Sequence, residues 1–288
     1  MSLVPEFLLA ELPPHSRLVA TNCADPVIFE RRFIFDSYAC RRGKGTHRAI
    51  DRAHSFQRKY TYVLKTDIVR FFPNVDHHVM KGLLRRSIRD EPFLRLIDLI
   101  IDSGNGILAN QATPAYFPGD NLFAILRPTG LPIGNLTSQF FANVLLDVID
   151  HFVKEQLRIP GYLRYADDLL LFANSKRQLW DARELLEQEL RKLRLRLHPD
   201  KTSLRPTFQP LTFLGLRLTP QDRRLSQSTL RRFNRRLRLQ KSSYRSSAMT
   251  SEEIQRSLIA FRGHCQSANA TAILGQILAR TRFRRSSR

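Results

Sequence analysis

The sequence predicts an α+β fold, in which short strands and long amphipathic helices alternate along the chain. Residues 60–65 form a short run rich in aromatic and branched side chains, and residues 162–172 place two apolar segments around a polar turn. Residues 139–157 repeat apolar side chains at helical spacing. With 42% hydrophobic residues, 288 residues suffice for one large domain or for subdomains that share a core.

The first half of the chain places one strand between helices. A basic stretch at 41–59 repeats apolar residues at helical spacing, which predicts a helix, and the strand at 60–65 then leads to Asp67. Two helices are expected within 77–101. An insertion with Gly and Pro follows at 103–132, and it is long enough for a hairpin or a flexible loop.

The second half becomes strongly basic toward its end. A helix is expected at 179–195 and a strand at 213–218 with Gly215 inside it. Residues 222–245 hold nine Lys or Arg and one acidic residue around an apolar helical stripe, which indicates a subdomain boundary. A capping-box pattern at 250–253 predicts the start of another helix.

The net charge of the chain indicates which class of molecule it binds. The formal charge is +21, from 47 Lys and Arg against 26 Asp and Glu. Such an excess attracts polyanions through counterion release, so nucleic acid is the leading partner class. No apolar run approaches the roughly 20 residues that span a bilayer, and no secretory signal pattern begins the chain, so we expect a cytoplasmic protein without a membrane partner. The three cysteines are far apart, which favours reduced thiols over disulfides or a zinc site.

Two adjacent carboxylates, Asp167 and Asp168, lie in the polar turn between the apolar segments. An isolated pair of Asp residues more often stabilises a turn than binds a metal ion, because Asp is favoured in turns. Beside an apolar hairpin, however, two such carboxylates repel unless a cation lies between them. Asp67 is the candidate third carboxylate of a two-ion Mg²⁺ site, with Mn²⁺ as the alternative ion.

Five blocks, in order, resemble the reverse transcriptases. They are Asp67 with Phe72, the stretch Gly130 to Gln139, Tyr165-Ala-Asp-Asp168, His198 to Lys201, and Phe213-Leu-Gly215. The resemblance covers residues 30–220. It implies a right-hand polymerase with fingers, a palm whose antiparallel sheet is backed by helices, and a small α-helical thumb. It also implies RNA-templated synthesis of DNA on a primer from deoxynucleoside triphosphates.

The resemblance divides the chain into three parts. We expect reduced fingers at 1–60, because the segment before the Asp36-Ser-Tyr stretch is short and broken by proline. The palm with the catalytic site is expected at 61–221, including the insertion, and a basic helical thumb with a tail at 222–288.

Two blocks narrow the resemblance further. Ile133 to Gln139, an aliphatic-Gly-x-x-x-Ser-Gln pattern, and Asp36 to His47 resemble the reverse transcriptases of bacterial and phage diversity-generating retroelements. This implies errors at template adenines, a structured RNA and a basic accessory variability protein. Two alternatives stay open: a defence-associated or domesticated reverse transcriptase, and an RNA-binding subunit with a polymerase fold that lacks catalysis.

The resemblance also implies roles for single residues. The metal ligands are Asp67, Asp167 and Asp168, joined by the backbone carbonyl of Ile68, and Lys201 acts near the departing pyrophosphate as a general acid or charge stabiliser. Nucleotide contacts are expected from Arg41, Arg42, Lys44, Phe72, Ile133 and Gly134. Template or primer contacts are expected from Ser138, Gln139, Tyr165, Phe213, Leu214, Gly215, Arg231 and Arg235.

Two of these residues bear on selectivity. Phe72 is expected to exclude a ribose 2′-hydroxyl by its bulk, which would select deoxynucleotides. Ile133 stands where most relatives have a Gln that contacts the incoming nucleotide, and an apolar side chain cannot form those hydrogen bonds. We therefore expect looser discrimination between nucleotides.

Overall fold

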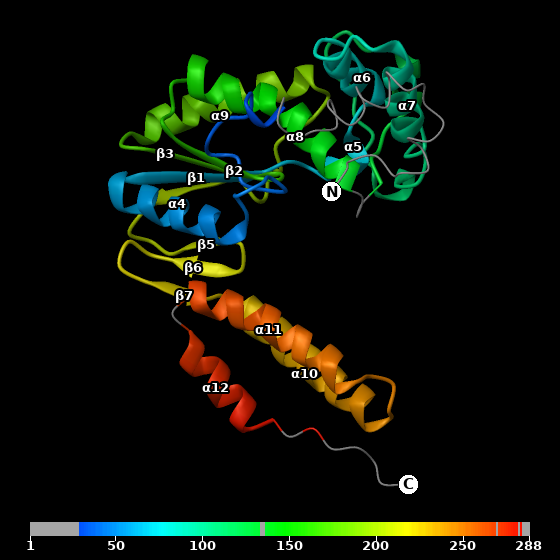
Figure 1. Ribbon diagram of the computed structural model, residues 1–288. Helices are drawn as coiled ribbons and strands as arrows, with labels where there is room; N and C mark the ends of the chain where they lie inside the picture. Colours follow the sequence, from blue (N-terminus) through cyan, green and yellow to red (C-terminus); the bar gives the residue numbers. More distant parts are fainter. Residues whose placement is uncertain (1–28, 133–135, 269, 282, 284–288) are drawn as a thin grey trace. The chain divides into compact units, whose positions relative to one another are not determined.

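The computed structural model describes residues 29–132, 136–268, 270–281 and 283 (Figure 1). The chain forms two compact units: unit 1 comprises residues 1–45 and 62–205, and unit 2 comprises residues 46–61 and 206–288. The first helix described in full, α4 (Thr46–Lys59), therefore belongs with the C-terminal residues. The expected division into fingers, palm and thumb concerns functional parts, and it stays a prediction.

Unit 1 is built on a four-stranded sheet with the order β2-β3-β1-β4. The strands are β1 (Tyr62–Asp67), β2 (Gly161–Tyr165), β3 (Asp168–Ala173) and β4 (Ser203–Pro206). The β3 strand pairs antiparallel with both β1 and β2. The predicted α+β class is confirmed, and the first strand begins two residues later than expected.

Helices pack with this sheet in the core of unit 1. They are α5 (Phe71–Asn74), α6 (His77–Arg85), α7 (Glu91–Asp102), α8 (Leu136–His151), the π-helical turn η3 (Phe152–Gln156) and α9 (Lys176–Lys192). Figure 1 shows α8 and α9 lying along one face of the sheet. The apolar stripe predicted in α8 is confirmed, because Leu145 and Ile149 are fully buried in the core.

The insertion at 103–132 contains no strand and forms two short 3₁₀ helices, η1 (Ala109–Gln111) and η2 (Leu122–Leu126). Two ion pairs attach it to the rest of unit 1. The Arg127 guanidinium donates to the buried carboxylate of Asp76, with an Nη2 to Oδ1 distance of 2.9 Å. The Arg194 guanidinium binds Asp120 within the insertion.

Unit 2 combines a small sheet with helices. The three-stranded antiparallel sheet contains β5 (Leu211–Phe213), β6 (Leu216–Leu218) and β7 (Arg223–Leu225), followed by α10 (Gln227–Arg245), α11 (Ser251–Ser267) and α12 (Thr271–Ala279). A single strand over 213–218 is wrong: Leu214 and Gly215 have φ values of 46° and 82° and form a turn between β5 and β6. The capping box of Thr250 and Glu253 at the start of α11 is confirmed.

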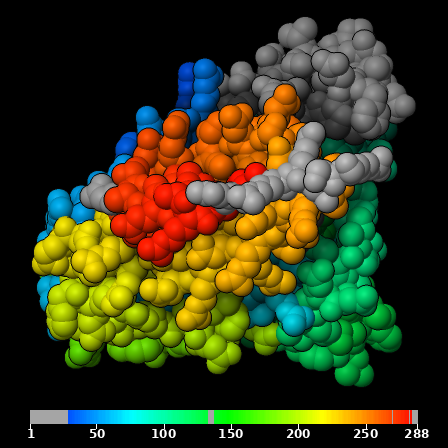
Figure 2. All heavy atoms as spheres, turned by 90° about the horizontal axis from the view of Figure 1, so that it is seen from below, coloured from blue at the N-terminus to red at the C-terminus, as the bar shows by residue number. Residues whose placement is uncertain are grey.

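Aromatic packing joins the helices of unit 2. Phe233 of α10 and Phe261 of α11 stack with ring centroids 3.5 Å apart. Figure 2 shows α10 in yellow-orange, α11 in orange and α12 in red on the same face of unit 2. On α4, Ile50 and Phe56 are buried. The helix therefore presents an apolar face to the core of unit 2.

Two further features concern membrane insertion and thiols. Among the described residues, no helix is both long and apolar enough to cross a bilayer. Of the cysteines that the structure describes, Cys40 is exposed, Cys265 is buried, and both are free thiols.

The buried amide of Gln57 links α4 to the small sheet of unit 2. Its Nε2 donates to the carbonyl oxygens of Thr207 and Leu218 at 2.9 and 3.0 Å. We expect Gln57→Ala to lower the free energy of unfolding by about 1–3 kcal/mol, because buried carbonyls lose their donor. Urea unfolding followed by circular dichroism measures this change.

The matched control is Gln255→Ala on the exposed surface of α11. Its free energy of unfolding should stay within about 0.5 kcal/mol of wild type. Equal destabilisation by the two substitutions would contradict the structural role of Gln57.

Candidate active site

The register of two strand pairs brings three carboxylates to one end of the sheet in unit 1. Asp67, the last residue of β1, lies directly opposite Asp168, the first residue of β3. Tyr165 of β2 also pairs with Asp168, so Ala166 and Asp167 form a two-residue hairpin turn. This register gathers Asp67, Asp167 and Asp168 at one end of the sheet, and their role as metal ligands stays a prediction.

The turn between β2 and β3 has an unusual backbone. Ala166 has a φ of 53°, in the left-handed region that costs a residue with a Cβ roughly 1–2 kcal/mol. A positive φ at this position suits a two-residue hairpin, because it matches the twist of the two strands. The fold therefore accepts local strain at the residue that precedes Asp167.

Burial and mutual repulsion perturb the carboxylates. Burial, followed by the charge of Asp67, raises the pKa of Asp167 from 3.8 to about 6. Burial also raises the pKa of Asp168, although the ammonium of Lys65 opposes this effect. The site thus concentrates negative charge that a bound cation would stabilise.

Two lysines contact these carboxylates. Lys201 Nζ forms an ion pair with the Asp67 carboxylate, and this hydrogen bond raises the pKa of Lys201. Lys65 Nζ lies 3.4 Å from Asp168 Oδ1. Both contacts partly offset the crowded negative charge.

Backbone and side-chain hydrogen bonds place Lys201 beside β1. The backbone N–H of His198 donates to the Asp67 carbonyl at 2.7 Å, and the hydroxyls of Thr66 and Thr202 lie 2.7 Å apart. The block from His198 to Lys201 is therefore attached to the same strand end as the carboxylates. The role of Lys201 near the departing pyrophosphate stays a prediction.

The donor set fits a hard divalent cation. The three carboxylates supply only oxygen, the ligand that Mg²⁺ and Mn²⁺ prefer. Within the described ranges, no group of three or more acidic, His or Cys side chains converges closely enough to enclose an ion. Ile68 is buried and forms a bridge with Leu197, and the role of its carbonyl as a ligand stays a prediction.

The residues expected at the nucleotide differ in their surroundings. Phe72 is half-buried and its ring lies 5.3 Å from that of buried Phe71. Arg42 is exposed, and Lys44 donates to the Phe35 carbonyl at 2.7 Å.

Arg41 has mostly internal contacts. Its guanidinium donates to Glu30 Oε2 at 2.9 Å and to the carbonyls of Ile34 and Ser37 at 2.6 and 3.0 Å. With 5% of its side chain exposed, Arg41 stabilises its own segment of unit 1.

Other expected contact residues lie on α8 and β2. Ser138 is buried and Gln139 half-buried at the start of α8, and Tyr165 is half-buried at the end of β2. Ile133 and Gly134 lie outside the described residues. The nucleotide and template contacts of all these residues stay predictions.

Unit 2 contains the residues expected at the primer. Phe213 is buried in β5, whereas Arg231 and Arg235 are exposed on α10. A Cβ on Gly215 would lie 2.8 Å from His264 Nε2, and φ is +82°, so only glycine fits this turn. Leu214, the other residue of the turn, is half-buried.

A cavity of about 550 Å³ lies beside this turn in unit 2. Arg232, Arg236 and His264 line it together with Gly215. Arg232 and Arg236 belong to the basic helix that the sequence predicted for the thumb, whereas no sequence pattern pointed to His264. Residues 46–61 and 206–288 also hold 21 of the 47 Lys and Arg but 4 of the 26 Asp and Glu.

Comparison with known proteins assigns this sequence to a family. The family model described as "Reverse transcriptase (RNA-dependent DNA polymerase)" matches residues 13–218. The retron Mx162 reverse transcriptase of Myxococcus xanthus is 29% identical over 178 residues, which cover 56% of this chain and 35% of the relative. Protein YkfC of Escherichia coli (strain K12) is 24% identical over 229 residues, which cover 66% of this chain and 57% of that relative. The chain thus spans about a third of the length of the retron reverse transcriptase and somewhat over half of the length of YkfC.

Solved structures share the fold. Apo telomerase from Candida tropicalis has a TM-score of 0.51 at 13% identity, covering 78% of this chain and 42% of that one. Telomerase from Candida albicans, in complex with a TWJ fragment of telomeric RNA, has a TM-score of 0.50 at 12% identity, covering 87% and 46%. At such identity the similarity concerns the fold alone, and it agrees with a polymerase architecture.

The raised pKa of Asp167 generates a prediction about stability. Between pH 3.8 and about 6, the folded state holds a proton on Asp167 that the unfolded state releases, so stability falls as pH rises through this range. We expect Asp167→Asn to raise the free energy of unfolding of metal-free protein by about 1–3 kcal/mol at pH 8. The gain should disappear below about pH 4, where both states bind the proton.

Urea unfolding in EDTA between pH 4 and 8 measures this difference. The control is Asp181→Asn on α9, whose carboxylate is 64% exposed. A gain for Asp167→Asn that does not change with pH would contradict the predicted cause.

Proposed function

This chain belongs to the reverse transcriptase family, and we propose that it is an RNA-directed DNA polymerase. In the proposed reaction, a primer 3′-hydroxyl attacks the α-phosphate of a deoxynucleoside triphosphate along an RNA template, and pyrophosphate leaves. The main support is the register that sets Asp67 opposite Asp168, with Asp167 in the adjoining turn.

The three carboxylates would hold the divalent ions of this reaction. Asp67, Asp167 and Asp168 are the proposed ligands, with the Ile68 carbonyl as a further one and Mg²⁺ or Mn²⁺ as the ion. Such ions make a hydroxyl more acidic and stabilise charge on phosphate oxygens. The raised pKa of Asp167 supports this assignment, because a nearby cation would relieve the repulsion.

Lys201 is the proposed partner of the leaving group. Its ammonium lies at the carboxylate end of the sheet through its ion pair with Asp67. With 57% of the side chain exposed, it can reach toward solvent, where it would donate a proton to pyrophosphate or stabilise its charge.

The remaining contacts are assigned to two surfaces. In unit 1, Phe72 would exclude the 2′-hydroxyl, and Arg42 and Lys44 would attract the triphosphate. In unit 2, the turn at Leu214 and Gly215 would hold the primer end. The basic excess of unit 2 supports nucleic-acid binding, because Lys and Arg gain affinity by releasing counterions from phosphates.

The carboxylates argue against a subunit that only binds RNA. A binding surface for phosphates gains nothing from three crowded negative charges. Burial is the largest cause that raises the pKa of Asp167 and of Asp168, and the charge of Asp67 raises both further, so their ionised forms are unfavourable without a cation. An enzyme has a reason to keep such a cluster, whereas a binding protein has none.

Primer extension on an RNA template tests the enzyme. We expect wild type to extend a DNA primer with Mg²⁺ or Mn²⁺, and Asp168→Asn to lower the rate by about a hundredfold or more, because ion binding supplies several kcal/mol in the transition state. Asp181→Asn, which removes an exposed carboxylate of α9, should extend like wild type. Absence of product from wild type, or equal rates for wild type and Asp168→Asn, would refute the proposal.

A finer proposal concerns fidelity. The blocks at 36–47 and 133–139 support a mutagenic enzyme of a diversity-generating retroelement that works with a structured RNA and a basic accessory variability protein. The similarity to a retron reverse transcriptase favours a second candidate, a defence-associated enzyme with the same chemistry. A near-repeat template encoded beside the gene, differing mainly at adenines, would select the first.

Ile133→Gln tests the mutagenic candidate directly. The amide can form hydrogen bonds that an isoleucine cannot, so we expect fewer misincorporations opposite template adenine while extension continues. Sequencing of the DNA product, with and without the accessory protein, measures the error spectrum. Ile133→Leu, which keeps an apolar side chain, is the control, and an unchanged spectrum in Ile133→Gln would contradict this candidate.

A further inference from the structure

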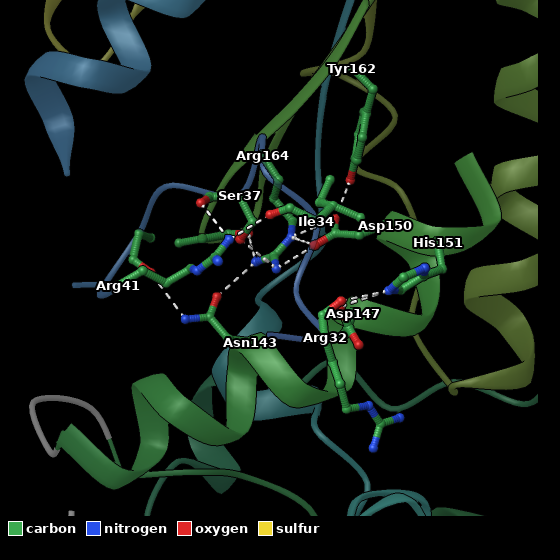
Figure 3. Close-up of polar contacts among 12 residues, drawn as sticks. Arg32, Ile34, Ser37, Arg41, Asn143, Asp147, Asp150, His151, Tyr162 and Arg164 are labelled. Atoms are coloured by element: carbon green, nitrogen blue, oxygen red, sulfur yellow. Dashed lines mark hydrogen bonds and ion pairs between the residues drawn. The ribbon is translucent and has the colours of Figure 1, made fainter. Parts of the chain in front are cut away.

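We propose that Arg164 is a positioning residue that holds the turn of Ala166 and Asp167 in the geometry needed for ion binding. The inference rests on the proposed function in one respect, since it treats Asp167 as an ion ligand. Its basis is a buried hydrogen-bond network around Arg164 in unit 1 (Figure 3).

Arg164 is a charged residue in the core of the protein. It lies within β2 and is 0% exposed, like its partner Asp150 on α8. Arg164 Nε donates to Asp150 Oδ1 at 2.8 Å, and Nη2 donates to Oδ2 at 2.7 Å. The Tyr162 hydroxyl donates to the same carboxylate at 2.7 Å, which adds to the compensation of the buried charge.

The guanidinium has donors left after this pairing. Nη1 donates to the carbonyl of Ala166 at 3.2 Å and to Asn143 Oδ1 at 3.1 Å. Nη2 donates to the hydroxyl of Ser37 at 3.0 Å. One planar group therefore contacts α8, the segment around Ser37 and the turn that precedes Asp167.

The segment around Ser37 is itself held firmly against β2. The Arg164 N–H donates to the Asp36 carbonyl at 2.9 Å, and the Tyr38 N–H donates to the Arg164 carbonyl at 3.0 Å. Asn143 Nδ2 also donates to the Ala39 carbonyl at 3.0 Å. The groups that orient Arg164 are thus fixed by their own hydrogen bonds.

Stability alone does not explain such a network. Well-packed apolar residues can replace a buried ion pair with little loss of stability, so the pair is a poor source of folding energy. An apolar side chain could not hold the Ala166 carbonyl and the Ser37 hydroxyl at once. The network instead fixes the position of the Ala166 carbonyl relative to α8 and to the segment around Ser37.

The Ala166 carbonyl belongs to the strained turn of the hairpin between β2 and β3. Ala166 has a φ of 53°, and Asp167 carries a charge that is repelled by Asp67. Without the bond from Arg164, the turn can relax and Asp167 can move away from its neighbours. Groups that orient metal ligands in this way typically change ion affinity by about 10–100-fold when they are removed.

The test measures Mn²⁺ binding through the electron paramagnetic resonance signal of the free ion, together with primer extension and thermal unfolding. Arg164→Lys keeps the positive charge opposite Asp150 but loses the planar arrangement of donors. We expect it to weaken Mn²⁺ binding by about tenfold or more. Ser37→Ala removes one orienting bond and should weaken Mn²⁺ binding by about fivefold.

The control is Arg85→Lys, which alters an exposed arginine paired with Asp98 on the surface of unit 1. It should bind Mn²⁺ like wild type. A positioning role predicts weaker Mn²⁺ binding and a higher Mn²⁺ requirement for extension at a temperature where the variants are folded. Wild-type Mn²⁺ affinity in folded Arg164→Lys would overturn the proposal, even if thermal stability were lower.

If Arg164→Lys does not fold, Ser37→Ala decides the question by the same comparison, and wild-type affinity in that variant would overturn the proposal. The binding readout needs neither template nor primer. Failure of wild type to extend a primer would therefore refute the proposed function, whereas unchanged Mn²⁺ binding in the variants would refute the role of Arg164.

Discussion

The antiparallel register between β1 and β3 is the constraint on which the candidate site depends. It sets Asp67 opposite Asp168, and like charges in directly opposed positions are unfavourable. The register is nevertheless fixed by buried pairs such as Leu64 with Leu171, because a slip of one residue would turn these side chains away from the core. Burial of apolar side chains thus holds the carboxylates together against their repulsion.

The two units divide the charge of the molecule between them. Most of the acidic residues, including the three carboxylates of the site, belong to unit 1, where positive and negative charges nearly balance. Most of the net positive charge belongs to unit 2. The net positive charge and the carboxylate cluster therefore lie in different units, which explains how a strongly basic protein can contain an acidic site.

Local patterns predicted much of this structure. The strand that ends at Asp67, the stripe of α8 and the capping box at Thr250 depend on neighbours in the sequence, and all three are present. The break between β5 and β6 was missed, because apolar residues around Gly215 look like one strand until the backbone angles are known. The pairing of Arg164 with Asp150 could not be predicted either, since strand and helix patterns do not show which buried charges meet.

The discontinuous composition of unit 2 has a consequence for the order of folding. Helix α4 leaves the ribosome early, whereas β5 and α11 follow only after all of residues 62–205. Contacts between distant parts of a chain form slowly, and chains fold from the N-terminus during synthesis. Unit 1 can fold once residue 205 has left the ribosome. The apolar face of α4 can be buried only after residues 206–288 have been synthesised. All residues of the unit with the carboxylates are therefore synthesised before those of the basic unit are complete.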